Sequence, residues 1–409
     1  MSTDKPASRI ISMDQFRGYT VAGMFLVNFV GSYAVVKKYL PALPHGDGYF
    51  AYADSIMPSF MFCAGFSYRL TAIRRFAQLG TAGAVLGYIR RSLALVGISL
   101  VIFGVGASFK AWNEVTSVSV SEWLCELIKA DLWEVLSIIG VSQILLLPVI
   151  NRSFKVRLMS AFGLLLLYIL MNYSFNYNFQ AGLDNWLNNY FGADKRRSWD
   201  GGMFGPVAWS IPILAGTLTY DVLAVWSPKK AMSLFLVLGV ILMAAGYGIS
   251  CLTRLYDRVE GTASASGPEH AEDPVWPSAE RWKTPGIGWS EPPFFAKVPN
   301  TQRQENFWMM KKRIIAPSFI FFSIGFALFL YALFISASDL GGLQVPLFRT
   351  LGQNPLAAYI IHELTMHCIK PAVPNDCPWY VLTIAFTLFF VITWGALKYM
   401  ESNKLYLRL

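Results

Sequence analysis

Polar side chains near the N-terminus of the chain include those needed for acyl transfer. His45 and Asp47 lie in a hydrophilic stretch, Asp54 follows at the unusually polar start of an apolar block, and Asn28 lies late in the preceding apolar block. A histidine oriented by a carboxylate can act as a general base or as a transient acyl acceptor. An asparagine amide can stabilise an oxyanion. Asn28, His45 and Asp54 together thus contain the parts needed for acyl transfer.

A second polar group lies in the sequence GQNPLAAYIIHE, which covers residues 352–363. His362 and Glu363 follow roughly ten residues after the start of a helix-length apolar block, which places them near mid-membrane. Asn354 precedes His362 by eight residues, or about two helical turns. Ionisable residues inside a membrane bundle mark functional sites, although a buried structural hydrogen bond remains an alternative.

A third group is SMDQFRG, residues 12–18, at the start of the first apolar block. Asp14 and Arg17 are three residues apart and can pair on one helix face. Two interpretations stay open: a charge-paired helix start, or contact of Arg17 with an anionic cytosolic ligand, since a guanidinium fork suits phosphate.

The elements that position these residues are membrane helices. The chain has 409 residues, of which 55% are hydrophobic and only 14% charged, about half the charge of a soluble domain. The apolar residues form continuous blocks of about 20, the length of a membrane-spanning helix, and their continuity excludes a β-barrel. We predict an all-α, polytopic helical bundle of ten spans, near 15–36, 51–72, 90–109, 132–150, 156–175, 204–225, 231–252, 314–336, 348–369 and 379–400.

The short loops on one side of these spans carry more Lys and Arg than those on the other side. The positive-inside rule therefore places both termini in the cytoplasm. A hydrophilic segment, 253–312, then falls on the outer side as a long irregular loop within a single domain covering residues 1–409. The net charge of +9 favours contact with anionic membrane lipids over nucleic-acid binding. No Cys/His spacing indicates a metal site.

Several motifs along the chain resemble one family. RIISMDQFRGYTVAGMFLVNFVG and PHGDGYFAYADSIMPSFMFCAGFS resemble the heparan-α-glucosaminide N-acetyltransferase family and its bacterial relatives. That family has an S-x-D-x-F-R-G start, V-N, a histidine-bearing loop and then A-D-x-x-x-P-x-F-x-F-x-x-G. The region from Asp200 to Gly216, the segment KKRIIAPSF and the segment GQNPLAAYIIHE resemble later family motifs in the same order.

The resemblance implies a transmembrane acetyltransferase in the bacterial inner membrane that uses cytosolic acetyl-CoA as co-substrate. The acceptor would be the amino group of a glucosamine-type sugar, or of a glycan carrying it, on the outer side. The family's catalytic histidine falls on His45, its asparagine on Asn28 and its aspartate on Asp54, and the resemblance also implies a homodimer. We predict that the donor is bound by Arg17, Arg90, Arg91 and Asn354, and the acceptor by Asp47, Asp200, His362 and Glu363.

Two departures from the family pattern concern the acceptor. The loop around His45 reads PHGDGY, without the tryptophan that the family often has, and the region after Asp200 reads DGGMFGP, without its glutamate. Two other functions therefore stay open. One is O-acetylation of an envelope polysaccharide or glycolipid; the other is proton-coupled transport of an amino sugar through His362 and Glu363.

Overall fold

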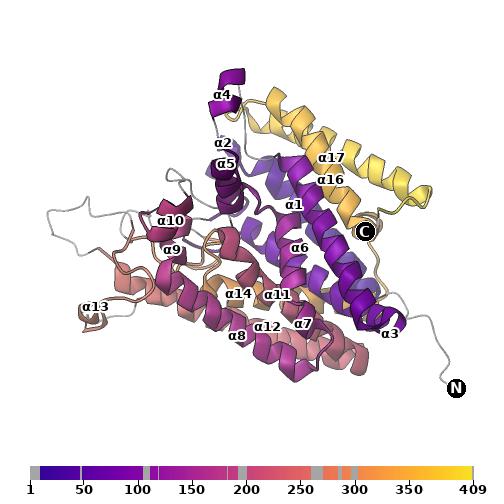
Figure 1. Ribbon diagram of the computed structural model, residues 1–409. Coiled ribbons are helices and arrows are strands. Elements are labelled where there is room, and N and C mark those ends of the chain that lie inside the picture. The colour runs from indigo at the N-terminus through magenta and orange to yellow at the C-terminus, as the bar shows by residue number, and fades with distance from the viewer. Residues whose placement is uncertain are drawn as a thin grey trace. The chain divides into compact units, whose positions relative to one another are not determined.

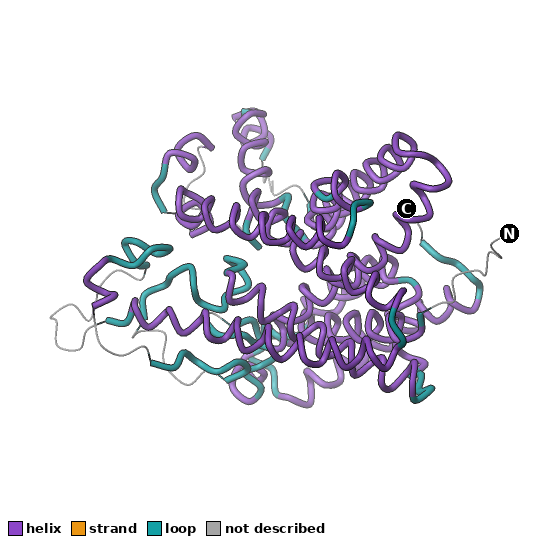
Figure 2. The backbone as a smooth tube through the Cα atoms, turned by 90° about the horizontal axis from the view of Figure 1, so that it is seen from below, coloured by secondary structure: helices purple, strands orange, loops and turns teal. Residues whose placement is uncertain are grey.

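The computed structural model is mostly helical. It describes residues 10–46, 48–104, 111–117, 119–181, 183–191, 200–258, 270–283, 288–295 and 303–407. These residues contain two isolated β-bridges but no β-strand (Figure 2). Contacts between Cα atoms divide the chain into two compact units. The first comprises Met1–Pro44, Val222–Ile241 and Gly325–Arg408, and the second comprises His45–Asp221 and Leu242–Ile324 together with Leu409.

The first unit contains the two ends of the chain. Its helices are α1 (Ile11–Val30), α2 (Ala34–Tyr39), α15 (Pro346–Gln353), α16 (Pro355–Ile369) and α17 (Trp379–Ser402), with the π-helix η6 (Ile335–Leu340) and the 3₁₀-helix η7 (Lys370–Ala372). Helix α1 packs against α15, α16 and α17, although about 330 residues of sequence separate them (Figure 1). The unit thus brings the N-terminal motif next to the GQNP motif.

The second unit contains most of the remaining helices. They are α3 (Tyr52–Phe103), α4 (Trp112–Ser117), α5 (Val120–Glu126), α6 (Val135–Leu145), α7 (Leu147–Ile150), α8 (Phe154–Met171), α9 (Tyr177–Ala181), α10 (Trp186–Phe191) and α13 (Ala279–Lys283), with the short helices η1 (Leu127–Asp131), η2 (Asn172–Asn176), η3 (Gly202–Phe204) and η4 (Cys251–Tyr256). Helices α11 (Gly205–Val225), α12 (Pro228–Ser250) and α14 (Pro317–Phe334) contribute residues to both units.

Each of the ten predicted spans overlaps a helix among the described residues, but several are merged with a neighbour or broken. The second and third predicted spans, 51–72 and 90–109, belong to the single element α3, interrupted only at Gly80 with φ 66° and ψ −179°. The ninth, 348–369, is broken into α15 and α16 at Asn354, with φ −132° and ψ 58°. The cause is Pro355, which disfavours helical dihedrals in the residue before it.

Six helices are long and apolar enough to cross a membrane, in the part of the chain that the structure describes: Tyr52–Phe103, Phe154–Ala181, Gly202–Val225, Pro228–Tyr256, Pro317–Leu340 and Trp379–Ser402. Large apolar side chains are exposed along two of them at helical spacing, namely Met159, Phe162, Leu166 and Leu170 on α8 and Ile384, Leu388 and Val391 on α17. Lipid is the solvent that suits such faces. The chain is therefore a multi-pass membrane protein, while the count of ten spans and the cytoplasmic termini stay predictions.

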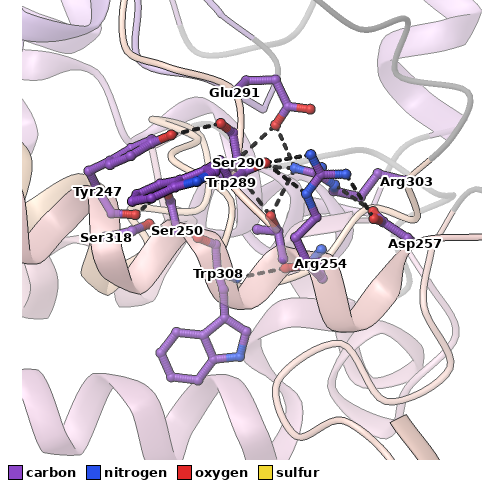
Figure 3. A network of polar contacts seen from close by, with 12 residues as sticks. Tyr247, Ser250, Arg254, Asp257, Trp289, Ser290, Glu291, Arg303, Trp308 and Ser318 are labelled. Atoms are coloured by element: carbon purple, nitrogen blue, oxygen red, sulfur yellow. Dashed lines mark hydrogen bonds and ion pairs between the residues drawn. The ribbon is translucent and has the colours of Figure 1, made fainter. Parts of the chain in front are cut away.

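The predicted outer segment, 253–312, has an ordered centre around Arg303, in which buried polar side chains join stretches far apart in sequence (Figure 3). The Arg303 guanidinium donates to Asp257 through Nε at 2.9 Å and to Glu291 through Nη1 at 2.5 Å. Arg254 binds the other carboxylate oxygen of Asp257 at 3.0 Å and also donates to the Trp289 carbonyl, while the Trp289 ring stacks on Tyr247. The buried guanidinium of Arg303 thus joins distant parts of the segment to one another, and Tyr247 links the segment to the end of α12.

Replacing Arg303 by methionine is expected to lower the free energy of unfolding by about 1–3 kcal/mol, because the change leaves the mostly buried Glu291 carboxylate without its cation, whereas Arg254 still pairs with Asp257. Thermal unfolding of the purified protein in detergent measures the effect. The control is Lys283→Met, an exposed cation in the same segment, which is expected to change stability by less than about 0.5 kcal/mol. Equal effects of the two substitutions would contradict the role assigned to Arg303.

Candidate active site

The loop before α3 places His45 against Asp54. His45 Nδ1 lies 2.7 Å from Asp54 Oδ1, and the Asp54 carboxylate is fully buried, whereas the His45 side chain is 51% exposed. The other carboxylate oxygen, Oδ2, accepts hydrogen bonds from the backbone N–H groups of Gly46 at 3.1 Å and Ala51 at 3.0 Å. Asp54 also lies in the first turn of α3, where the helix dipole favours a negative charge.

This geometry defines the tautomer of His45. An ionised carboxylate accepts hydrogen bonds only, so Nδ1 carries the proton and Nε2 carries the free lone pair. A carboxylate that holds an imidazole in this way also stabilises the imidazolium that forms when Nε2 takes up a proton. A histidine held in this way can act as a general base or a nucleophile at Nε2, and a catalytic role of His45 stays a prediction.

An aromatic cluster fixes the loop that carries this pair. Phe50 is fully buried and packs on Phe294, Phe319 and Phe322, with ring centroids 4.6–5.8 Å apart. The backbone N–H of Phe294 also donates to the Phe50 carbonyl at 2.6 Å. Phe294 belongs to the segment 253–312, so this segment directly supports the His45 loop.

The first unit brings Asn28 together with His362 and Glu363. Asn28 Nδ2 lies 3.4 Å from His362 Nε2, and Glu363 Oε1 lies 3.2 Å from the same nitrogen. His362 Nδ1 lies 2.6 Å from the Tyr359 carbonyl. The Nδ1 atom of His362 thus faces a carbonyl oxygen, while Nε2 lies between the Asn28 amide nitrogen and the Glu363 carboxylate.

Further groups enclose this buried polar set. The Phe25 ring stacks on His362 with centroids 5.2 Å apart, and Lys370 Nζ donates to the Asn28 carbonyl at 3.1 Å. Burial lowers the pKa of Lys370, while the neighbouring Glu363 acts in the opposite direction. His362 is fully buried and Glu363 nearly so, which confirms that ionisable groups lie deep within the helices.

The motif SMDQFRG anchors α1 to the C-terminal part of the first unit. Ser12 Oγ donates to Asp339 at 2.6 Å, and the Gln15 side chain exchanges two hydrogen bonds with the backbone of Val345. Arg17 contacts Asp14 at 3.4 Å, as predicted, and also donates to the Gly352 carbonyl at 3.2 Å. These bonds favour the structural interpretation of the motif.

Two glycines of these motifs allow the helices to approach closely. A Cβ atom on Gly18 would lie 1.8 Å from the Phe348 carbonyl oxygen, and one on Gly352 would lie 2.1 Å from the Asp14 carbonyl oxygen. Only glycine leaves room for such backbone contact between membrane helices. The glycines in F-R-G and G-Q-N therefore serve the packing of α1 against α15.

Asn354 has both amide atoms in use. Its Nδ2 donates to the Leu405 carbonyl at 3.0 Å, and its Oδ1 accepts from the Leu407 N–H at 3.2 Å. The side chain thus ties the C-terminal tail to the break between α15 and α16. Binding of the donor by Asn354 stays a prediction, and such binding would have to replace these two bonds.

Of the arginines predicted to bind the donor, Arg90 is exposed and Arg91 is partly buried on α3. The Arg91 Nε atom is buried and has no hydrogen-bond partner among the described residues. Arg75 interacts with Arg91 as a like charge and lies over the Tyr88 ring, 4.9 Å from its centroid. An uncompensated pair of guanidinium groups attracts phosphate.

A second group of arginines belongs, in the sequence, to the short-loop charges from which the topology is predicted. Arg157 is fully buried on α8 and shares the Asp221 carboxylate with Arg69, whose Nε lies 2.9 Å from it. Two guanidinium groups thus face one carboxylate, and Arg157 Nη1 is buried without a hydrogen-bond partner among the described residues. The spacing of these residues carries no signal for the cluster, because they come from α3, α8 and α11.

Asp200 is held in an uncommon backbone conformation, with φ 45°. Its Oδ2 lies 3.3 Å from Lys312 Nζ, and its carbonyl accepts a hydrogen bond from the Trp209 indole at 3.1 Å. The remaining predicted acceptor residue, Asp47, lies outside the described residues.

A comparison with known protein families shows to which family the chain is related. The family described as heparan-alpha-glucosaminide N-acetyltransferase, catalytic, matches residues 9–235. The chain belongs to this family. The match includes the dyad of His45 and Asp54 as well as Asn28, so the predicted catalytic residues lie within the family's catalytic region. A comparison with curated proteins found no significant match.

Membership confirms the resemblance and supports N-acetyltransferase activity by a membrane protein. The matched region ends before the segment 253–312 and before His362 and Glu363. Features of the chain beyond residue 235 are therefore interpreted from their own geometry.

Proposed function

We propose that this family member transfers an acetyl group from cytosolic acetyl-CoA to the amino group of a glucosamine-type sugar on the extracytoplasmic side of the membrane. The observation that carries the proposal is the hydrogen bond between His45 and the buried carboxylate of Asp54, located within the family's catalytic region. The family match runs through residues of both units, which supports a single acyltransferase domain.

His45 would act through Nε2. It takes a proton from the acceptor amine as the amine nitrogen bonds to the acetyl carbon, and it then protonates the departing CoA sulfur when the C–S bond breaks. Asp54 stabilises the transient imidazolium. Whether an acetyl-histidine forms is a separate question, and Nε2 also has the lone pair required for that route.

The chain has cationic groups that fit the phosphates of acetyl-CoA, whose thioester supplies the activated acetyl group. Arg91 and Arg157 each have a buried nitrogen atom without a hydrogen-bond partner among the described residues, and such atoms favour an anionic ligand. Arg17 and Arg90 remain candidates, although Arg17 already contacts Asp14 and Gly352.

Asn28 would donate its amide N–H to the oxyanion of the acetyl group. Its contact with His362 holds the amide in place. His362 and Glu363, and likewise Asp47 and Asp200, are proposed to bind the acceptor. A cytoplasmic donor and an outer acceptor require a protein that spans the membrane. Location in the bacterial inner membrane and a homodimer are part of the same proposal.

The first experiment is binding of acetyl-CoA to the purified protein, measured by calorimetry on the wild type and on Arg91→Met. The wild type is expected to bind, and Arg91→Met to bind about tenfold to a hundredfold more weakly, as expected for loss of a charge-assisted hydrogen bond. Arg349→Met is the control, because Arg349 is 58% exposed. No binding by the wild type at millimolar acetyl-CoA would refute the acetyltransferase proposal.

Two alternatives predict different outcomes. The buried pair His362 and Glu363 is the feature that a proton-coupled amino-sugar transporter would need, and a transporter would move sugar into vesicles without acetyl-CoA. An O-acetyltransferase would use the same donor but acetylate a hydroxyl group and ignore added glucosamine. Flux and product analysis in one vesicle preparation therefore separate the three functions.

A further inference from the structure

The end of α8 and the short helices that follow it carry a buried series of polar side chains, each four residues from the next. These are Tyr168, Asn172, Asn176 and Gln180, hereafter the amide ladder. All four are at most 2% exposed. In a span exposed to lipid, uncharged amides at this spacing face the protein interior rather than the hydrocarbon.

Internal bonds use only part of the ladder. Asn172 Nδ2 donates to the Tyr168 carbonyl at 2.9 Å, and Gln180 Nε2 donates to the Tyr168 hydroxyl at 3.0 Å. The oxygen atoms Asn172 Oδ1 and Gln180 Oε1 are buried without a hydrogen-bond partner among the described residues, as are both amide atoms of Asn176. Buried amide atoms normally have a partner, so these atoms point to a ligand or ordered water.

Asp200 joins the ladder through a short backbone stretch. The Tyr168 hydroxyl donates to the Ile314 carbonyl at 2.7 Å, the Gly201 N–H donates to the Arg313 carbonyl at 3.0 Å, and Lys312 pairs with Asp200 Oδ2. Asp200 Oδ1 is buried and lacks a hydrogen-bond partner among the described residues. The carboxylate thus adds another available oxygen to the same region.

The available atoms specify the chemistry of a ligand. Four are acceptor oxygens, on Asn172, Asn176, Gln180 and Asp200, and one is a donor, Asn176 Nδ2. A ligand that matches them must offer several O–H or N–H donors and at least one acceptor, as the hydroxyl groups of a sugar ring do. Because Lys312 balances Asp200, the site suits uncharged hydroxyls rather than an anion or a bare cation.

Packing links this region to the His45 loop within the second unit. The Trp209 indole donates to the Asp200 carbonyl, and its ring meets Phe319 edge-on with centroids 6.0 Å apart. Phe319 in turn packs on Phe50, 5.7 Å away between centroids, in the loop before α3. The same aromatic side chains therefore support the ladder's carboxylate and the loop of His45.

We propose that the amide ladder and Asp200 bind the ring hydroxyls of the sugar acceptor. The inference rests on the proposed function, because it takes the ligand to be the acceptor, and it assigns the binding to Asn172, Asn176, Gln180 and Asp200. His45 would act on the amino group, while the ladder holds the uncharged remainder of the ring.

The test is binding of glucosamine and of N-acetylglucosamine to the purified full-length protein in detergent, without acetyl-CoA, by calorimetry. The variant is Asn176→Leu, which keeps the side-chain size but removes both polar atoms, and the control is the exposed Asn189→Leu. Asn176→Leu is expected to bind both sugars at least about tenfold more weakly than the wild type, and Asn189→Leu to bind them normally.

A second measurement separates ligand binding from a structural role. The Asn176 amide lies near the Tyr168 hydroxyl, but neither of its polar atoms is within hydrogen-bond distance of a partner among the described residues. Asn176→Leu is therefore expected to unfold without ligand at the same temperature as the wild type or higher. A clear loss of stability would show a structural amide and overturn the inference. Unchanged sugar affinity would also overturn it, and would indicate that only water occupies the ladder.

The ladder inference and the proposed acetyl transfer can fail separately. If the wild type acetylates glucosamine and Asn176→Leu does so with an unchanged KM, the ladder inference fails and the proposed function stands. If sugar binding depends on Asn176 but no acetyl transfer occurs at saturating acetyl-CoA, the site stands and the proposed function fails.

Discussion

His45→Ala is expected to reduce acetyl transfer by about 10²- to 10⁴-fold, the usual contribution of a positioned general base. The reason is that Nε2 of His45 has the free lone pair, while Asp54 holds Nδ1 at 2.7 Å. Radioactive acetyl transfer from acetyl-CoA to glucosamine in membrane vesicles measures the effect. Binding of acetyl-CoA is expected to remain, since the phosphate-binding candidates lie on other residues.

The control for this substitution is His367→Ala, because His367 is 67% exposed on α16 and is expected to leave the rate unchanged. Asp54→Asn tests the tautomer argument separately. An asparagine preserves the size of the side chain but offers an N–H toward His45, so it favours the wrong tautomer and is expected to slow transfer strongly. Normal transfer by His45→Ala would remove His45 from the mechanism.

Asn28→Ala is expected to lower kcat by about 10²- to 10³-fold, the range measured for loss of one oxyanion donor. KM for acetyl-CoA should change little, because an oxyanion forms only in the transition state. Steady-state kinetics on the purified protein separates the two parameters. Asn403→Ala is the control, since Asn403 is exposed near the C-terminal end of the chain. A rise in KM with normal kcat would contradict the oxyanion role.

A double-mutant comparison tests whether Asn28 and His45 act in the same step. If they do, His45→Ala and Asn28→Ala are expected to be strongly non-additive, because removing one member of a catalytic set leaves little for the other to contribute. The matching comparison of Asn28→Ala with His362→Ala tests the 3.4 Å contact between these side chains. Additive effects in the first comparison would assign Asn28 to another role.

Much of this protein follows from local sequence patterns. Continuous apolar blocks predicted helices at all ten positions, because the membrane demands that a segment satisfy its own backbone hydrogen bonds. The pairing of Asp14 with Arg17 follows from their spacing of three residues on a helix. His45 and Asp54 were chosen by residue type, and the family match covers both.

The tertiary structure decided what these residues contact. Asn28 contacts His362 across 334 residues of sequence. At the break between α15 and α16, the Asn354 side chain binds the backbone of the C-terminal tail. Arg157 reads as a loop charge in the sequence, yet it is buried against Asp221. The amide ladder shows no sequence signal that separates it from ordinary polar residues at the end of a span. Such contacts depend on packing between distant helices, whereas sequence patterns report only neighbours within one or two turns.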